Sequence, residues 1–320
     1  MDQRLQNVVL TIIFIVGLAG AVMGRQTLSA MTAPPPIPDN PRRIVSLAPS
    51  ITETLFALGL GGRVIGVTEY CRHPPEVQAL PRVAGFSDVN FEAVLRSRPD
   101  LTVLPVDKLA NARELERLGL TVLPLDVRSL TGYLQAVGEL GEVMSRQAEA
   151  AAIIGRLEAA VEAARNRAGG RRRPRTLFSV MHSYQGFGYI TEITAVGQDG
   201  FFSQLLDFAG GENVYQGPLS FPSLTREAIL TLNPEVVVDL VRNEEEARQA
   251  LEDWRGLGGL AAVKAGRLHM FADEADTVPG PRIGQTLAKL SLVCHPETPA
   301  LAPGGPDDAA RTAPAASSRP

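Results

Sequence analysis

The sequence predicts an α/β protein of two lobes joined by one long α-helix. Three observations support this fold class: short β-branched apolar runs alternate with helical segments, one helix-strand unit occurs twice, and an Ala-, Glu- and Arg-rich stretch separates the two copies. With 320 residues, 45% of them hydrophobic and 21% charged, the chain is long enough for two domains. Its net charge of -4 offers no basic field to a phosphate backbone, so nucleic acid is not an expected partner.

The N-terminal segment differs in composition from the rest of the chain. Residues 8–24 form an uninterrupted apolar run between two arginines, which predicts a signal peptide or an N-terminal membrane anchor over residues 1–30. Both alternatives stay open, and both predict an exported protein, in the periplasm or at the outer face of the cytoplasmic membrane. No Cys closely follows the run, so a lipid anchor is not indicated. The Pro-rich residues 31–41 are predicted to be a spacer.

Residues 42–129 are predicted to form the N-terminal α/β lobe. Strands are expected at 43–47, 63–68, 101–105 and 121–125, and helices at 51–58, 91–98 and 108–118. Ser50 and Glu53 have the spacing of a capping box, in which a hydroxyl and a carboxylate satisfy the first N–H groups of a helix. Regular alternation of strand and helix predicts a parallel sheet.

The second half of the chain repeats this alternation after a helical stretch. Residues 130–170 are predicted to be the connecting backbone helix, with room for a shorter helix before the long one. Residues 171–296 are predicted to form the C-terminal α/β lobe, with strands at 176–181, 235–240 and 267–271 and helices at 201–208, 226–232 and 281–293. Residues 297–320, rich in Ala, Pro and Gly, are predicted to be a disordered tail.

The repeated unit is the most informative feature of the sequence. NFEAVLRSRPDLTVLP at residues 90–105 aligns without a gap with TREAILTLNPEVVVDL at residues 225–240, so that Glu92 corresponds to Glu227 at an offset of 135 residues. A capped helix followed by a strand is common in α/β proteins, and the helix dipole alone favours a Glu in the first turn. Two equivalent glutamates suggest a second role, since a partner with paired cationic side chains could bind both.

A family resemblance is carried by the run RIVSLAPSITETLFALGLGGRVIGVTEYCRHPPEVQALPRV at residues 43–83, by the repeat, and by GPRI at residues 280–283. Over roughly residues 42–296 the chain resembles the cobalamin and ferric-siderophore periplasmic binding proteins. The resemblance implies a helical-backbone, class III binding protein that captures cobalamin, a ferric siderophore or another metal chelate in a cleft between its lobes. It further implies delivery of this ligand to an ABC permease in the membrane. We expect a monomer, no cofactor and no catalytic activity.

The resemblance also implies which residues carry the function. The carboxylates that dock onto permease arginines in this family match Glu92 and Glu227. The cleft aromatics of the cobalamin binder match Tyr70, Phe86 and Phe221, although this chain has Phe where that binder has Trp at the latter two positions. Flat aromatic side chains suit such a ligand because they bury a large apolar area with few rotatable bonds. Packing in the core is the alternative role for each of them.

Two polar residues complete the predicted ligand site. His182 directly follows the predicted strand at 176–181, and Arg282 lies in the GPRI sequence where it could meet an anionic group of a chelate. A buried structural histidine and an arginine that stabilises the closing helix are the alternatives. The four histidines lack the close spacing of a zinc site, and Cys71 and Cys294 are expected to be separate thiols, so no metal site is predicted.

Other classes of function have less support in the sequence. The chain contains no G-x-S-x-G elbow, no G-x-x-x-x-G-K-[ST] loop and no G-x-G-x-x-G motif after a strand. No sequence motif therefore indicates a catalytic nucleophile or a phosphate-binding loop. An envelope-anchored ligand sensor or interaction module would use the same fold without a transporter. That module, and an α/β enzyme with an interlobe active site, remain the alternatives.

Overall fold

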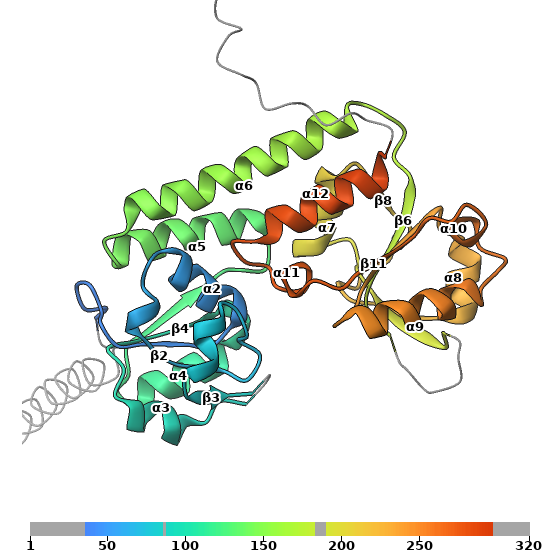
Figure 1. Ribbon diagram of the computed structural model, residues 1–320. Coiled ribbons are helices and arrows are strands. Elements are labelled where there is room, and N and C mark those ends of the chain that lie inside the picture. The colour runs from blue at the N-terminus through green and yellow to red at the C-terminus, as the bar shows by residue number, and fades with distance from the viewer. Residues whose placement is uncertain (1–35, 86–87, 183–189, 297–320) are drawn as a thin grey trace, which may run out of the picture. The chain divides into compact units, whose positions relative to one another are not determined.

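The computed structural model describes residues 36–85, 88–182 and 190–296. These residues form two compact α/β units, whose elements are labelled in Figure 1. Of the described residues, unit 1 takes those up to Thr52 and Leu60–Leu125, whereas unit 2 takes Glu53–Gly59 and those from Asp126 onward. The predicted N-terminal signal peptide or anchor, the predicted tail and Phe86 lie outside the described residues. Of the helices in the described part, none combines the length and the apolar character needed to cross a bilayer.

Unit 1 is built on a five-stranded parallel sheet in the order β3-β2-β1-β4-β5. Its strands are β1 (Ile44–Ser46), β2 (Val64–Thr68), β3 (Arg82–Ala84), β4 (Leu101–Pro105) and β5 (Val122–Leu125). Its helices are α3 (Phe91–Ser97), α4 (Leu109–Arg117), the first part of α2 (Pro49–Ala57) and the short 3-10 helices η1 (Gly61–Arg63), η2 (Pro75–Ala79) and η3 (Val106–Lys108). Every residue of β4 is buried, as expected of a parallel strand covered on both faces.

Unit 2 has a mixed sheet in the order β11-β10-β6-β7-β9, with β8 paired to β6. The strands β8 (Glu212–Asn213), β6 (Arg175–His182), β10 (Val236–Leu240) and β11 (Leu268–Phe271) are parallel. The strands β7 (Glu192–Ala195) and β9 (Ser223–Thr225) are antiparallel to their neighbours. The sequence did not predict β7 and β9, because runs of four and three residues are too short to display a period of two.

The predicted connecting helix consists of two helices, α5 (Leu130–Val143) and α6 (Gln147–Ala168). The chain turns between them at Ser145, which has a φ of 54°. Figure 1 shows α5 and α12 (Ile283–Cys294) alongside α6, and both pack against it within unit 2. The long helix is therefore part of the helical layer of unit 2. The remaining helices of this unit are α7 (Phe201–Phe208), α8 (Arg226–Leu232), α9 (Glu244–Arg255), α10 (Ala261–Lys264) and α11 (Glu274–Thr277).

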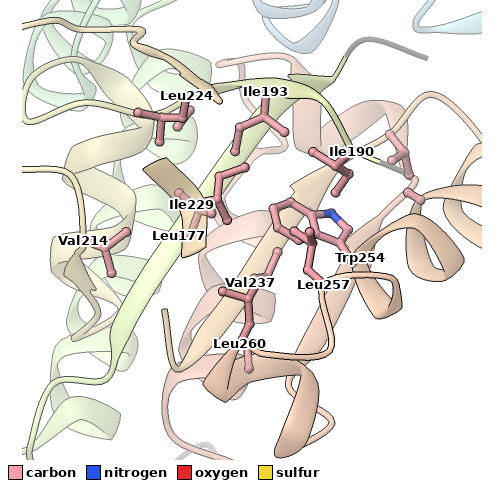
Figure 2. Close-up of a cluster of buried hydrophobic side chains, with 14 of the residues drawn as sticks. Leu177, Ile190, Ile193, Val214, Leu224, Ile229, Val237, Trp254, Leu257 and Leu260 are labelled. Carbon is pink, nitrogen blue, oxygen red and sulfur yellow. The ribbon is translucent and has the colours of Figure 1, made fainter. Parts of the chain in front are cut away.

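The core of unit 2 centres on Trp254, the single tryptophan of the chain (Figure 2). Its ring is fully buried among apolar side chains that include Leu177 and Val237. Its indole Nε1 donates a hydrogen bond of 2.8 Å to Oδ2 of the buried Asp239. A buried tryptophan needs such an acceptor for its one N–H donor.

The predicted capping box is wrong. Helix α2 begins at Pro49, so Ser50 lies inside it, and the carboxylate of Glu53 accepts hydrogen bonds from Arg282 Nε at 2.8 Å and Nη2 at 2.6 Å. Because Glu53 is buried, two charge-assisted bonds from a guanidinium compensate its desolvation better than one backbone N–H can. The closing helix begins at Ile283 and not at Pro281.

Candidate ligand-binding and docking sites

The repeated unit has the same bounds in both copies. Helix α3 and strand β4 in unit 1 correspond to α8 and β10 in unit 2, residue for residue at the offset of 135. Each helix is capped by a side-chain oxygen: Asn90 Oδ1 accepts from Ala93 N at 2.9 Å, and Thr225 Oγ1 accepts from Ala228 N at 3.4 Å. The sequence match thus reflects a true structural duplication of the local backbone.

Both helices also end in the same way. Arg98 has a φ of 48° and Asn233 has a φ of 44°, so each copy leaves its helix through a residue in the left-handed region. Non-glycine residues other than Asn and Asp adopt this conformation at some cost. In unit 1 Arg43 donates to the carbonyl of Arg98 at 3.0 Å, and in unit 2 Arg175 donates to the carbonyl of Leu232 at 2.8 Å.

The acids at the helix-strand junction have a structural role. Asp100 Oδ2 accepts hydrogen bonds from the backbone N–H groups of Arg42 and Arg43, both at 2.9 Å. Glu235 Oε2, at the equivalent position, accepts from the N–H of Arg175 at 3.0 Å. Each carboxylate therefore holds the start of the neighbouring parallel strand, β1 or β6. Arg172 pairs with Glu235 and lowers the pKa of that carboxyl below its ordinary value.

Glu92 and Glu227 have no comparable role in packing. Both are exposed and lie in the first helical turn, where the helix dipole favours a negative charge. Hydrogen bonds from its own backbone N–H and from Thr225 lower the pKa of Glu227, so this side chain is ionised at neutral pH. Glu92 instead forms an i,i+4 ion pair with Arg96. The residue equivalent to Arg96 is Thr231, whose hydroxyl donates to the carbonyl of Glu227 at 2.8 Å.

Tyr70 is presented by a tight turn after β2. The N–H of Cys71 donates to the carbonyl of Thr68 at 3.2 Å, and Arg82 Nη1 donates to the carbonyls of Thr68 at 3.0 Å and Cys71 at 2.7 Å. These bonds fix the backbone on both sides of Tyr70, whose side chain is 49% exposed. A held turn with a half-exposed ring can bind a flat ligand without much loss of conformational entropy.

Phe221 lies just before β9 in unit 2 and is 55% exposed. Its backbone is held against the end of β7, where the N–H of Gly197 donates to the carbonyl of Ser220 at 2.8 Å. A Cβ at Gly197 would lie 1.8 Å from the carbonyl oxygen of Leu219, so only glycine permits this approach. Because more than half of the Phe221 side chain is exposed, core packing is excluded as its role.

His182 and Arg282 are each paired with a buried carboxylate of unit 2. His182 Nδ1 lies 3.0 Å from Asp239 Oδ2, the atom that also accepts from Trp254, and the His182 side chain is 3% exposed. Arg282 forms the two bonds to Glu53 described above, and its pKa is raised mainly by them. The structure places both residues in polar networks of the fold, and their contact with a ligand stays a prediction.

Two of the hollows that described residues line lie on unit 2. One of about 630 Å³ is lined by charged and amide side chains of α9 and of residues just before it, including Arg242 and Glu252. The other, about 410 Å³, lies along α5 and α6 and is lined in part by Phe208 and Arg165, whose guanidinium is 4.7 Å from the centre of the Phe208 ring. None of the predicted ligand residues is among the described residues that line these hollows.

No metal centre is evident in the described part of the chain. Among those residues, no three His, Cys, Asp or Glu side chains gather closely enough to hold an ion. Cys71 and Cys294 are separate, buried thiols, one in each unit. Burial raises the pKa of the Cys294 thiol to about 11, so it is protonated and unreactive at neutral pH.

Two α/β units that share a duplicated helix-strand segment agree with the class of two-lobed solute-binding proteins. The sequence profile described as periplasmic binding protein matches residues 44–274, more than half of the chain. The chain therefore belongs to the periplasmic binding protein family. This result confirms the class III fold and the family predicted from the sequence.

Known relatives carry names of this class. The chain is 26% identical over 269 residues to an "Uncharacterized ABC transporter substrate-binding lipoprotein YvrC" of Bacillus subtilis, covering 82% of each chain. It is 28% identical over 263 residues to a vitamin B12-binding protein of Vibrio campbellii, covering 80% of this chain and 90% of the relative. It is also similar to the structure of the periplasmic heme-binding protein RhuT from Roseiflexus sp. RS-1, with 26% identity, a TM-score of 0.66, and coverage of 80% of this chain and 98% of that chain.

Proposed function

We propose that this protein is the substrate-binding component of an ABC importer that captures a metal chelate. The observation that carries the proposal is membership of the periplasmic binding protein family together with an exposed glutamate in each copy of the repeated unit. The relatives named for ABC transport, vitamin B12 and heme support it. The ligand is cobalamin, a ferric siderophore or another metal chelate, and the protein acts outside the cytoplasmic membrane as a monomer without catalytic activity.

In this proposal Tyr70 and Phe221 contact the ligand directly, and Phe86 does so as the third aromatic. The support from the structure is that Tyr70 and Phe221 are half-exposed rings on backbone segments that hydrogen bonds hold in place. Such rings lose little entropy when a planar ligand covers them. His182 and Arg282 are proposed to lie next to the bound ligand. Each keeps its carboxylate partner, Asp239 or Glu53, when the ligand binds.

Glu92 and Glu227 are proposed to dock onto cationic side chains of the permease. Their exposure and their equivalent positions support this role. Neither carboxylate holds a neighbouring strand inside its own unit, as the junction acids do. Two weak charge pairs that form together give a longer-lived complex than either pair alone. They also fix the orientation of the complex.

The experiment that tests the ligand class is a titration of the purified protein with cobalamin, cobinamide, haem and a ferric siderophore. Quenching of the single tryptophan, Trp254, reports binding, and calorimetry gives the stoichiometry. We expect one chelate to bind with a Kd below about 10 μM, which corresponds to about 7 kcal/mol. The absence of binding by all four chelates at that concentration would overturn the proposal.

A variant pair locates the site in the same assay. Tyr70→Ala should weaken binding about ten-fold, since a covered aromatic ring contributes about 1.5 kcal/mol or more, whereas Tyr70→Phe should bind nearly as well as the parent protein. Leu292→Ala is the matched control, because Leu292 is an equally exposed apolar side chain on α12. Equal affinities for Tyr70→Ala and Leu292→Ala would remove Tyr70 from the site.

A further inference from the structure

A hollow of about 410 Å³ in the helical layer of unit 2 lies between α5, α6 and the end of α7. Four apolar side chains are among the described residues that line it: Leu130, Leu134, Val161 and Phe208. The last three of these are partly exposed to solvent. Apolar side chains gathered around a hollow at the surface indicate a place where another segment binds.

Helix α6 supplies one wall of this hollow. Glu158, Val161 and Arg165 are three and four residues apart, so they lie on one face of the helix. At a rise of about 1.5 Å per residue, the wall from residue 158 to residue 166 is about 12 Å long. The Arg165 guanidinium lies 4.7 Å from the centre of the Phe208 ring. The hollow is therefore a short groove with a cation at the end nearest the C-terminus of α6.

The described part of the chain ends close to this cationic end of the groove. Helix α12 packs against α6 and α7, and after it His295 Nε2 lies 3.3 Å from the carbonyl oxygen of Gly210, two residues beyond Phe208. A Cβ at Gly210 would lie 2.6 Å from both Ala168 Cβ and His295 Nε2. Ala168 ends α6, and at three residues from Arg165 it is about 5 Å along the helix from the groove.

The sequence that follows the described part suits the groove. Residues 299–303 read Pro-Ala-Leu-Ala-Pro, an apolar run that ends before two glycines. Its prolines favour the extended polyproline conformation, in which five residues span about 15 Å. That length matches the groove of about 12 Å. Because prolines restrict the free chain as well, such a run loses little conformational entropy when it binds beside an aromatic side chain.

Charge gives the run a direction along the groove. Burial lowers the pKa of His295, and the nearby charges of Arg171 and Arg267 lower it further, so the described chain ends among cations. Glu297 follows His295 by two residues and brings a carboxylate to these cations. The apolar run at residues 299–303 then begins beside the cationic end of the groove.

We propose that residues 299–303 of this chain bind in the groove, with Leu301 against Val161 and Phe208 and with Glu297 at the cationic end. The run is tethered next to the groove by a short connection, so its effective concentration there is on the order of mM and weak contacts suffice. The bound run covers apolar side chains of α5, α6 and α7 and stabilises the helical layer of unit 2. This inference is independent of the proposed function, because it needs neither the ligand nor the permease.

The test measures how fast a thiol introduced into the full chain reacts with dithionitrobenzoate. Ala302→Cys places the thiol in the run, and Ala313→Cys is the matched control, because both alanines precede a proline. Cys71 and Cys294 are buried and give little background. We expect the thiol of Ala302→Cys to react about ten-fold more slowly than that of Ala313→Cys, as for a run that is bound about nine-tenths of the time.

Two further variants show whether the groove provides this protection. Val161→Lys places a charge in the middle of the groove and should raise the reaction rate of Ala302→Cys to that of Ala313→Cys. Leu301→Asp should have the same effect from the side of the run, and it should lower Tm by about 2 °C. In a protein that already carries Val161→Lys, Leu301→Asp should leave Tm unchanged. Ala313→Asp is the control for an added charge in the same part of the chain.

Each other outcome overturns the inference in its own way. Equal rates for Ala302→Cys and Ala313→Cys in the parent background would show that the run does not bind. Protection that persists in both the Val161→Lys and the Leu301→Asp backgrounds would show that the run binds elsewhere. Self-association that depends on protein concentration and is abolished by Val161→Lys would assign the groove to a second copy of the chain.

Discussion

The two copies of the helix-strand unit share a backbone but differ in the side chains around it. Both have a capped seven-residue helix, a left-handed exit and a five-residue buried strand. Both use a carboxylate, Asp100 or Glu235, to hold the first residues of the neighbouring strand. The copies differ at the helix surface, where Glu92 forms an i,i+4 ion pair with Arg96 and the residue equivalent to Arg96 in the second copy is Thr231.

This comparison separates structural acids from exposed ones. Asp100 and Glu235 are equivalent because the same junction must satisfy the same backbone N–H groups, which is a requirement of folding. Among the described residues, Glu92 and Glu227 accept no hydrogen bond from a neighbouring strand, so beyond the preference of the helix dipole for a first-turn glutamate the repeated carboxylate leaves room for a functional explanation. The proposed docking to a permease supplies it.

The largest expected effect on stability comes from the junction acids. Asp100→Ala leaves the N–H groups of Arg42 and Arg43 without their acceptor, and Glu235→Ala leaves that of Arg175, so each should lower the free energy of unfolding by about 0.5–1.5 kcal/mol. Urea unfolding followed by circular dichroism measures this change. Asp107→Ala, which removes an exposed carboxylate of η3, is the control and should change stability by less than about 0.5 kcal/mol. Junction variants as stable as this control would contradict the assigned role.

The contribution of Glu235 should also depend on pH. The bonds from Arg172 lower its pKa in the folded protein below the ordinary value of 4.5, so the ionised form is favoured by folding. Its stabilisation is fully present above about pH 4.5 and is lost as the pH falls through the lowered pKa. The difference in unfolding free energy between the parent protein and Glu235→Gln should therefore shrink between pH 6 and pH 3. A difference that grows toward low pH would refute this sign.

The left-handed exits should respond to glycine with opposite signs. Arg98→Gly removes the strain of a side chain at positive φ and should stabilise the protein by up to about 1 kcal/mol. Asn233→Gly removes the side-chain oxygen that accepts from Ala261 N at 2.9 Å and should destabilise it by about 1 kcal/mol. Thermal unfolding of the two variants measures both changes. Changes of the same sign would show that the copies are more alike than their hydrogen bonds indicate.

The smallest effect is expected at the surface pair of Arg96 and Glu92. An exposed i,i+4 pair contributes about 0.3–0.5 kcal/mol at low salt, so Arg96→Ala should lower stability by no more than that. The loss should vanish in 0.5 M NaCl because salt screens the pair. Thr231→Arg tests the converse by giving Glu227 an equivalent partner. A loss above 1 kcal/mol that persists in high salt would assign the pair a structural role.

Much of the fold could be predicted because the repeated unit carries strong local signals. Capping residues, a break at Pro and a β-branched run placed α3, β4, α8 and β10 to within one residue. The antiparallel strands β7 and β9 could not be predicted, because their pairing depends on residues far apart in the sequence and each strand is very short.

Prediction of the candidate sites had the same limit, because contacts between residues far apart in the sequence could not be foreseen. Tyr70 and Phe221 could be found through the family resemblance, and the structure exposes both. The partner of Arg282 was hidden, since Glu53 lies 229 residues away and its spacing from Ser50 favoured a capping box.

The most direct test of the account is ligand uptake by cells that carry the cognate permease and either the parent protein or the Glu92→Ala, Glu227→Ala double variant. The control is the Glu76→Ala, Glu244→Ala double variant, which also removes one exposed first-turn glutamate from each unit. Uptake should be lost in the docking variant and retained in the control, while both bind the chelate with the affinity of the parent protein. Unchanged uptake by the docking variant would contradict the central claim that these two carboxylates dock the protein onto its permease.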